Sequence, residues 1–117
     1  MSLPSLEELN LSGCEHLTWP GLHQLLRAVG SRLRRLDLSV TRLDWEAFDQ
    51  LQTPDFPSLW WLNLEHCHVL SDRALAKLLA EWSEHLQVVD LTGTRLSKRK
   101  ECMLKFEEVH RSIVFKY

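Results

Sequence analysis

Leu6-Glu-Glu-Leu9-Asn-Leu11 opens a pattern that returns at Leu33-Arg-Arg-Leu36-Asp-Leu38, Leu59-Trp-Trp-Leu62-Asn-Leu64 and Leu86-Gln-Val-Val89-Asp-Leu91. The first positions of these four segments lie 27, 26 and 27 residues apart. A fixed period of this length is the signature of a repeat architecture, in which each unit covers its neighbour. The alternation Leu9-x-Leu11 is typical of a strand with one buried face. The frame therefore predicts four short parallel strands in register.

Each segment is the LxxLxL core of a leucine-rich repeat. We therefore predict an α/β fold, a right-handed leucine-rich-repeat solenoid shaped as a short horseshoe. It has about four repeats, starting near residues 6, 33, 59 and 86, with strands on the concave face and helices on the convex face. A C-terminal cap is expected over residues 97–117, so that residues 1–117 form a single domain.

The residue that follows each strand in the turn is small and weakly polar. It is cysteine at Cys14 and Cys67, and threonine at Thr41 and Thr94. Such a group can meet backbone atoms that the turning chain leaves unpaired. Because free cysteine is among the most buried residue types, we expect Cys14 and Cys67 to be buried turn residues.

Two long helices are expected between the strands. Thr18 is a suitable N-cap for the first, and Ser71 or Asp72 begins the second. Their inward faces are predicted from helical spacing: Leu22, Leu25, Leu26 and Val29 in the first, and Leu75, Leu78, Leu79 and Trp82 in the second.

A shorter helix is expected to begin at Asp44, with Phe48 and Leu51 inward. The last helix is expected to begin at Ser97. Its buried side is predicted to carry Met103, Leu104, Phe106 and Val109. Ile113 and Phe115 then take the buried positions of a truncated fifth strand.

The composition is that of an ordinary globular protein. Of the 117 residues, 44% are hydrophobic and 26% charged, and the net charge of -2 supplies no global field for nucleic acid or anionic membrane. Three widely spaced cysteines do not suggest a disulfide framework. Neither a spanning apolar run nor a secretory signal is apparent, so the cytoplasm or nucleus is the expected location.

The stretch from Leu6 to Leu26 follows LxxLxLxxCxxLTxxGLxxLL, and Leu59 to Leu79 repeats it with Ser71-Asp72 in place of Thr18-Trp19. This sequence pattern resembles the cysteine-containing repeats of the F-box/leucine-rich-repeat family. The resemblance implies a module that presents a substrate to a ubiquitin ligase. In that family a separate F-box recruits the ligase, and this chain leaves no segment for one.

Residues between the leucines point away from the core, so the alignment places them in columns on the concave face. The expected partner-binding residues come from three columns: Glu8, Arg35, Trp61 and Val88, then Asn10, Asp37, Asn63 and Asp90, then Glu65. Arg35 beside Trp61 joins two residue types that dominate interface hot spots. The alternative, equally compatible with the sequence, is that the loop around Trp60 or the tail covers Trp61.

The sequence contains little that indicates a catalytic site, a metal site or a cofactor site. Asp37 and Asp90 should lie about 10 Å apart, too far to share a metal ion. His66-Cys67-His68 lacks the paired spacing of zinc sites. The Lys98-Arg99-Lys100 run at a helix start opposes the helix dipole by a few tenths of a kcal/mol, and nothing in the sequence accounts for it.

The sequence therefore predicts a non-enzymatic protein–protein interaction module without cofactor or metal. The resemblance further implies a substrate-recognition or adaptor part of a ubiquitin-ligase-type complex, and we expect protein partners and neither nucleic acid nor membrane as ligand. The alternative is a small structural or regulatory subunit of a larger assembly. Only Met1 to Ser5 precede the first strand, so self-association or an N-terminal neighbour is expected at that open edge.

Overall fold

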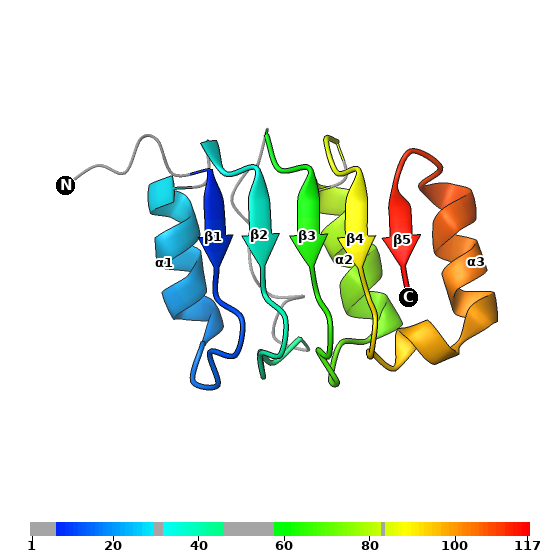
Figure 1. Cartoon of the computed structure of the whole chain (residues 1–117), viewed down its shortest axis with the longest axis horizontal. Coiled ribbons are helices and arrows are strands. Elements are labelled where there is room, and N and C mark those ends of the chain that lie inside the picture. Colours follow the sequence, from blue (N-terminus) through cyan, green and yellow to red (C-terminus); the bar gives the residue numbers. More distant parts are fainter. Residues whose placement is uncertain (1–6, 30–31, 46–57, 83) are drawn as a thin grey trace.

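Five short strands form one parallel sheet in a computed structural model that describes residues 7–29, 32–45, 58–82 and 84–117. The strands are β1 (Glu8–Asn10), β2 (Arg35–Asp37), β3 (Trp61–Asn63), β4 (Val88–Asp90) and β5 (Val114–Lys116). Their order in the sheet is their order in the chain, so each strand pairs with the next (Figure 1). The predicted α/β class with parallel strands is confirmed.

The register of the sheet is the one that the leucine frame predicts. Leu9 lies opposite Leu36, which lies opposite Leu62, and Leu62 lies opposite Val89. Phe115 continues this row on β5, so the strand expected at the end of the chain is present. The side chains of Leu36, Leu62 and Val89 are fully buried, and this row forms the centre of the core.

The helices are α1 (Trp19–Val29), α2 (Asp72–Trp82) and α3 (Lys100–Val109), with a short 3₁₀ helix, η3 (Leu96–Lys98), before α3. In Figure 1, α2 lies behind the sheet, α1 beside β1 and α3 beside β5. The predicted caps of the first two helices are confirmed. Gly21 donates its backbone N–H to Thr18 Oγ1 at 3.3 Å, and Ala74 donates to Ser71 Oγ at 3.1 Å.

The predicted inward faces of α1 and α2 are largely correct. Leu22 and Leu26 are buried and Leu25 is half-buried, whereas the side chain of Val29 lies outside the described residues. All four apolar residues predicted for α2 are buried. Most of the helix expected to begin at Asp44, including Phe48 and Leu51, falls within residues 46–57 and so lies outside the described part of the chain.

The last helix differs from the prediction at its start and on its buried face. Ser97 lies within η3, and α3 begins at Lys100 with Arg99 at the N-cap and no side-chain cap. Met103 is buried, but Leu104 is 50% and Val109 74% exposed, so the prediction was wrong for these two. Because α3 lies beside the last strand, it packs on one side only, with Phe106 6.5 Å from the Phe115 ring.

A left-handed residue occupies the same position in all four described turns. These residues are Gly13 (φ 76°), Val40 (φ 56°), His66 (φ 55°) and Gly93 (φ 76°). Each directly precedes the cysteine or threonine of its turn, namely Cys14, Thr41, Cys67 and Thr94. A Cβ on Gly93 would lie 2.2 Å from Nδ1 of His66, so the neighbouring turn also excludes a side chain there. The turns therefore repeat as regularly as the strands.

Candidate protein-interaction surface

An arginine and a tryptophan meet on the outward face of the sheet, as predicted. The Arg35 guanidinium carbon lies 4.5 Å from the centroid of the Trp61 ring and 5.9 Å from that of Trp60. Arg35 Nη1 also lies 3.4 Å from Oε1 of Glu8 on the adjacent strand. Cation–π contacts are worth about 0.5–1 kcal/mol at exposed sites. Since Trp61 remains partly exposed, a partner can reach the indole that Arg35 holds in place.

We call the row Glu8, Arg35, Trp61 and Val88 the strand-face row, because each member lies opposite the next across the sheet. Val114 extends this row on β5 and is 60% exposed, a residue that sequence reasoning did not include. The leucine frame ends before β5, so the signal for Val114 was its alternation with Ile113 and Phe115. The row ends in two valines and begins with an ion pair, which makes it amphipathic along its length.

The second column serves mainly to hold the turns. Each of its four side chains accepts a hydrogen bond from the backbone N–H two residues later: Asn10 from Ser12, Asp37 from Ser39, Asn63 from Glu65 and Asp90 from Thr92. Asx turns of this kind are local structure, not ligand sites. Asn63 is only 7% exposed and its Nδ2 donates to Glu65 Oε1 at 3.1 Å, so Asn63 presents little to a partner.

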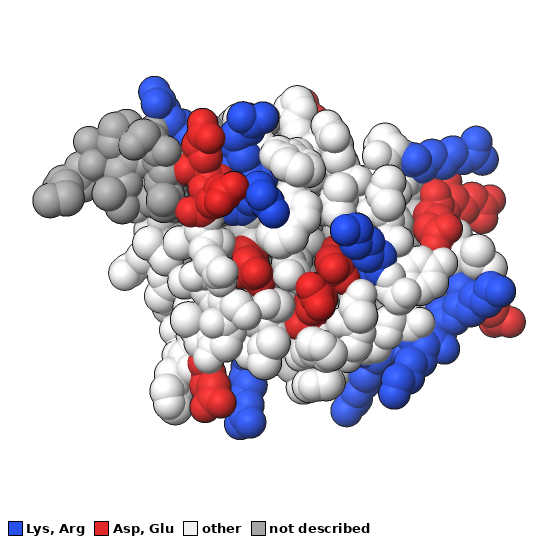
Figure 2. All heavy atoms as spheres, viewed as in Figure 1, with Lys and Arg blue, Asp and Glu red and all other residues white. Residues whose placement is uncertain are grey.

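The charges on this face are mixed. Figure 2 shows carboxylates across the middle of the sheet face, with one basic side chain directly beside them and other basic residues toward the margins. Ser12 and Ser39 occupy the positions equivalent to Glu65 after β1 and β2, and their hydroxyl groups form a hydrogen bond of 2.8 Å, while Glu65 remains half-exposed. The face therefore offers an acidic centre beside the Arg35–Trp61 pair.

The turn position behaves differently at the two cysteines. Cys67 is buried, donates its Sγ hydrogen to the Leu38 carbonyl at 3.2 Å, and lies 3.8 Å from Thr41 Oγ1. Burial raises the pKa of the Cys67 thiol. Cys14 is exposed, so the prediction of a buried Cys14 was wrong. The Leu38 carbonyl that accepts the Cys67 hydrogen belongs to the neighbouring strand and turn, whereas no described strand pairs with β1 on the side away from β2.

Within residues 7–29, 32–45, 58–82 and 84–117, no three histidine, cysteine or acidic side chains converge as a metal site would require. The His66 and His68 rings stand 6.1 Å apart, and Cys67 between them turns inward. In the same residues, no helix is long and apolar enough to cross a membrane.

Comparison with known proteins gives one informative similarity. No protein-family model and no curated protein matches the chain. Among solved structures, a chain in the crystal structure of the Rad7 and Elc1 complex in yeast matches with a TM-score of 0.66 and 28% sequence identity. The match covers 82% of this chain but 23% of that one, so this chain spans about a quarter of the length of the protein it resembles. The chain is thus similar in fold to part of a protein found in a protein–protein complex.

Proposed function

We propose that the chain is a leucine-rich-repeat module that binds another protein through the strand-face row. The observation that carries this proposal is the Arg35–Trp61 contact, which fixes a large, partly exposed aromatic ring at the middle of the sheet. The repeat assignment rests on the 26- and 27-residue spacing, together with turns that match residue by residue. The similarity to a chain of the Rad7 and Elc1 complex supports a role in protein assembly.

The finer proposal is a substrate-recognition or adaptor role in a ubiquitin-ligase-type complex. Its support is the resemblance of the cysteine-containing repeats to the F-box/leucine-rich-repeat family. In this role the protein is non-enzymatic and acts in the cytoplasm or nucleus. The partner segment fitting this face carries a cation or hydroxyl near the acidic centre, with an apolar group over Trp61 and Val88.

Loss of the Arg35–Trp61 pair is expected to abolish partner capture. Truncation of a hot-spot residue costs about 2 kcal/mol or more, roughly a thirtyfold loss in affinity for each residue. The test is quantitative capture from lysate with wild type and with Trp61→Ala/Arg35→Ala. The adaptor role further predicts that subunits of a ubiquitin ligase are recovered with the captured proteins.

The control for this experiment is Tyr117→Ala/Arg111→Ala, which also removes one aromatic ring and one guanidinium from exposed positions. We expect the control to capture the same proteins as wild type. Circular dichroism should show that both variants are folded. If the Trp61 and Arg35 variant retains every protein that the control retains, the strand-face row is not the binding surface.

A second candidate is a structural subunit that docks through the edge of β1. Three leucines of β1 and the turn that follows it, Leu9, Leu11 and Leu17, are only half-buried. The equivalent residues of the next three strands and their turns are all buried: Leu36, Leu62 and Val89, then Leu38, Leu64 and Leu91, then Leu43, Leu70 and Leu96. A parallel strand with a leucine opposite Leu9 would complete this layer and accept the Cys14 thiol, as Leu38 accepts that of Cys67.

If the β1 edge is a docking site, we expect the wild-type protein to self-associate and the Cys14→Arg variant to remain monomeric. The exposed side chain at this position can change without disturbing the core, whereas a bulky cation obstructs a strand stacking on the turn. Sedimentation velocity over a concentration series should show wild-type association and a variant that sediments as a monomer. If wild type is monomeric throughout, self-association through this edge is excluded.

A further inference from the structure

Five cations gather at one end of the molecule between β4 and the middle of α3. They are Arg95, Lys98, Arg99, Lys100 and Lys105, all exposed, and we call them the basic ridge. Glu101 is the one carboxylate in residues 95–105, so this segment carries a net charge of +4 in a chain of net charge -2. Figure 2 shows basic side chains massed at the lower right, where Figure 1 draws the link from β4 into α3.

A pocket of about 570 Å³ adjoins the ridge, between the start of α2 and η3. Its wall combines apolar side chains with two members of the ridge: Val69, Leu70, Ala74, Leu96, Arg95 and Arg99. Val69 is 54% exposed, whereas Leu70, Ala74 and Leu96 are each at most 3% exposed, so Val69 supplies most of the apolar surface that solvent can reach. A surface with both features suits a ligand that carries negative charge beside an apolar group.

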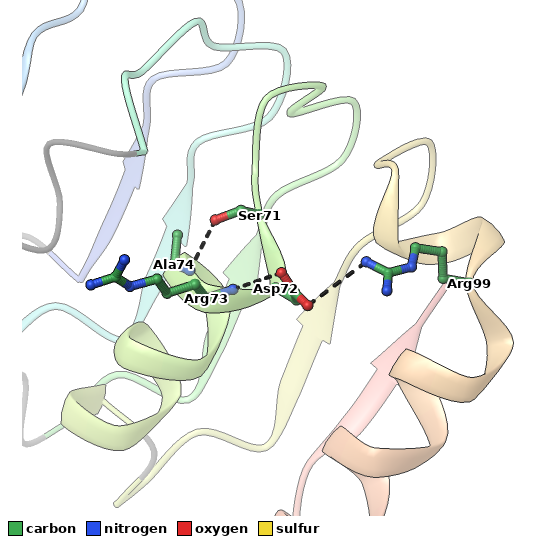
Figure 3. Close-up of polar contacts among 5 residues, drawn as sticks. All are labelled: Ser71, Asp72, Arg73, Ala74 and Arg99. Carbon is green, nitrogen blue, oxygen red and sulfur yellow. Dashed lines mark hydrogen bonds and ion pairs between the residues drawn. The ribbon is translucent and has the colours of Figure 1, made fainter.

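The ridge is poorly neutralised by the protein itself. Arg99 Nη1 lies 3.7 Å from Asp72 Oδ2, and Figure 3 shows Arg99 reaching toward α2 for this contact while Arg73 points away. In the described part of the chain, the other four ridge cations have no carboxylate within 4.0 Å. Lys98 and Lys100 also flank the start of α3, where positive charge opposes the helix dipole. An anionic partner would relieve both unfavourable arrangements.

The start of α2 does not contribute free donors to this site. Ser71 Oγ accepts from the Ala74 N–H, and Asp72 Oδ1 accepts from the Arg73 N–H at 3.0 Å (Figure 3). The backbone N–H groups of Arg73 and Ala74 are therefore occupied, and Asp72 lines the same pocket with its carboxylate. The ridge cations are what remains to bind negative charge.

We infer that the basic ridge and its pocket bind an acidic peptide segment of a partner protein, with one apolar side chain of that segment in the pocket. The apolar wall has no role in contacts with a phosphate backbone. No residue from 95 to 105 is aromatic, and Trp45, which lines the pocket, is only 2% exposed, so the site lacks the exposed stacking platform of single-stranded nucleic-acid sites. This surface is separate from the strand-face row, and the inference does not rest on it.

Binding is measured by fluorescence anisotropy with a labelled peptide of glutamate and serine around a central leucine. We expect Lys98→Glu/Lys100→Glu to weaken binding at least tenfold, because two attractive charges become repulsive. This variant also places carboxylates at the start of α3, where they favour the helix, so unfolding cannot explain the loss. Replacing the central leucine of the peptide by serine should weaken binding severalfold through loss of the pocket contact.

Two controls separate this site from general charge attraction and from the proposed function. Arg27→Glu/Arg32→Glu makes the same change in net charge elsewhere and should alter the affinity less than twofold. Trp61→Ala/Arg35→Ala should bind the peptide as wild type does, whatever happens to its other partners. The inference is overturned if a peptide with glutamine in place of glutamate binds as tightly as the acidic peptide. It is also overturned if Arg27→Glu/Arg32→Glu loses as much affinity as Lys98→Glu/Lys100→Glu. Tighter binding of single-stranded RNA or phosphatidylserine vesicles than of the peptide would overturn it too.

Discussion

Replacing Leu62 by alanine is expected to lower the free energy of unfolding by about 3 kcal/mol, within the range of 2–5 kcal/mol for a buried leucine. Leu62 is fully buried in β3 and lies between Leu36 and Val89 in the central row of the core. The five strands fix the backbone on both sides, so the cavity cannot close by a local shift. Urea unfolding followed by circular dichroism measures the loss.

Leu104→Ala is the matched control, because it removes the same atoms from a leucine that is 50% exposed on α3. We expect a change within about 0.5 kcal/mol, since alanine also favours a helix. Helical spacing alone placed Leu104 in the core, and this pair of variants compares the two assignments directly. Equal destabilisation at the two positions would contradict the packing of α3 described here.

The sheet was predictable because the leucine frame fixes three properties at once. Its spacing gave the number of strands before β5, its alternation gave the buried face, and its alignment gave the register that places Arg35 opposite Trp61. One shift of register would have moved every leucine to the outer face, so the pattern left a single solution. The contact between Arg35 and Trp61 follows from this register.

What could not be predicted depends on neighbours that lie outside each repeat. Cys14 and Cys67 have equivalent positions in the sequence, yet burial requires a preceding turn, and only Cys67 has one among the described residues. The apolar residues of α3 suggested one face, but a helix at the end of a sheet has one side to bury. Met103 therefore packs inward, whereas Val109 does not.

The roles of surface residues also depend on contacts that form only in the fold. The Asn and Asp column could be read from the sequence as ligands or as turn formers, and the hydrogen bond from the N–H two residues later decides for the turn. The Lys98-Arg99-Lys100 run was recognisable in the sequence as an unfavourable cluster of positive charge at a helix start. Its meaning depends on the pocket beside α2, which forms only when Leu70 and Leu96 come together in the fold.

Cys67 is expected to react with a thiol reagent at least a hundredfold more slowly than Cys14 in the native protein. The reactive species is the thiolate, and burial both raises the pKa of Cys67 and excludes the reagent, whereas Cys14 is exposed. Cys102 is half-buried, so its rate should lie between the two. Alkylation followed by mass spectrometry of the peptides gives the three rates. Comparable rates at Cys14 and Cys67 would show that the turn between β3 and α2 is open.

The same burial makes stability depend on pH in a defined direction. The folded state raises the pKa of Cys67, so it favours the neutral thiol; the stability from this group is complete below about pH 8.5 and is lost as the pH rises through the folded pKa. Cys67→Thr is the control, since threonine occupies the equivalent turns at Thr41 and Thr94 and does not titrate. Cys102 and Tyr117, whose pKa values are also raised, titrate in both proteins and so cancel in the difference. Urea unfolding at a series of pH values should therefore show the free energy of unfolding of wild type falling faster than that of Cys67→Thr above about pH 8.5. Parallel pH dependence of the two proteins would exclude the buried thiol as a cause of the loss.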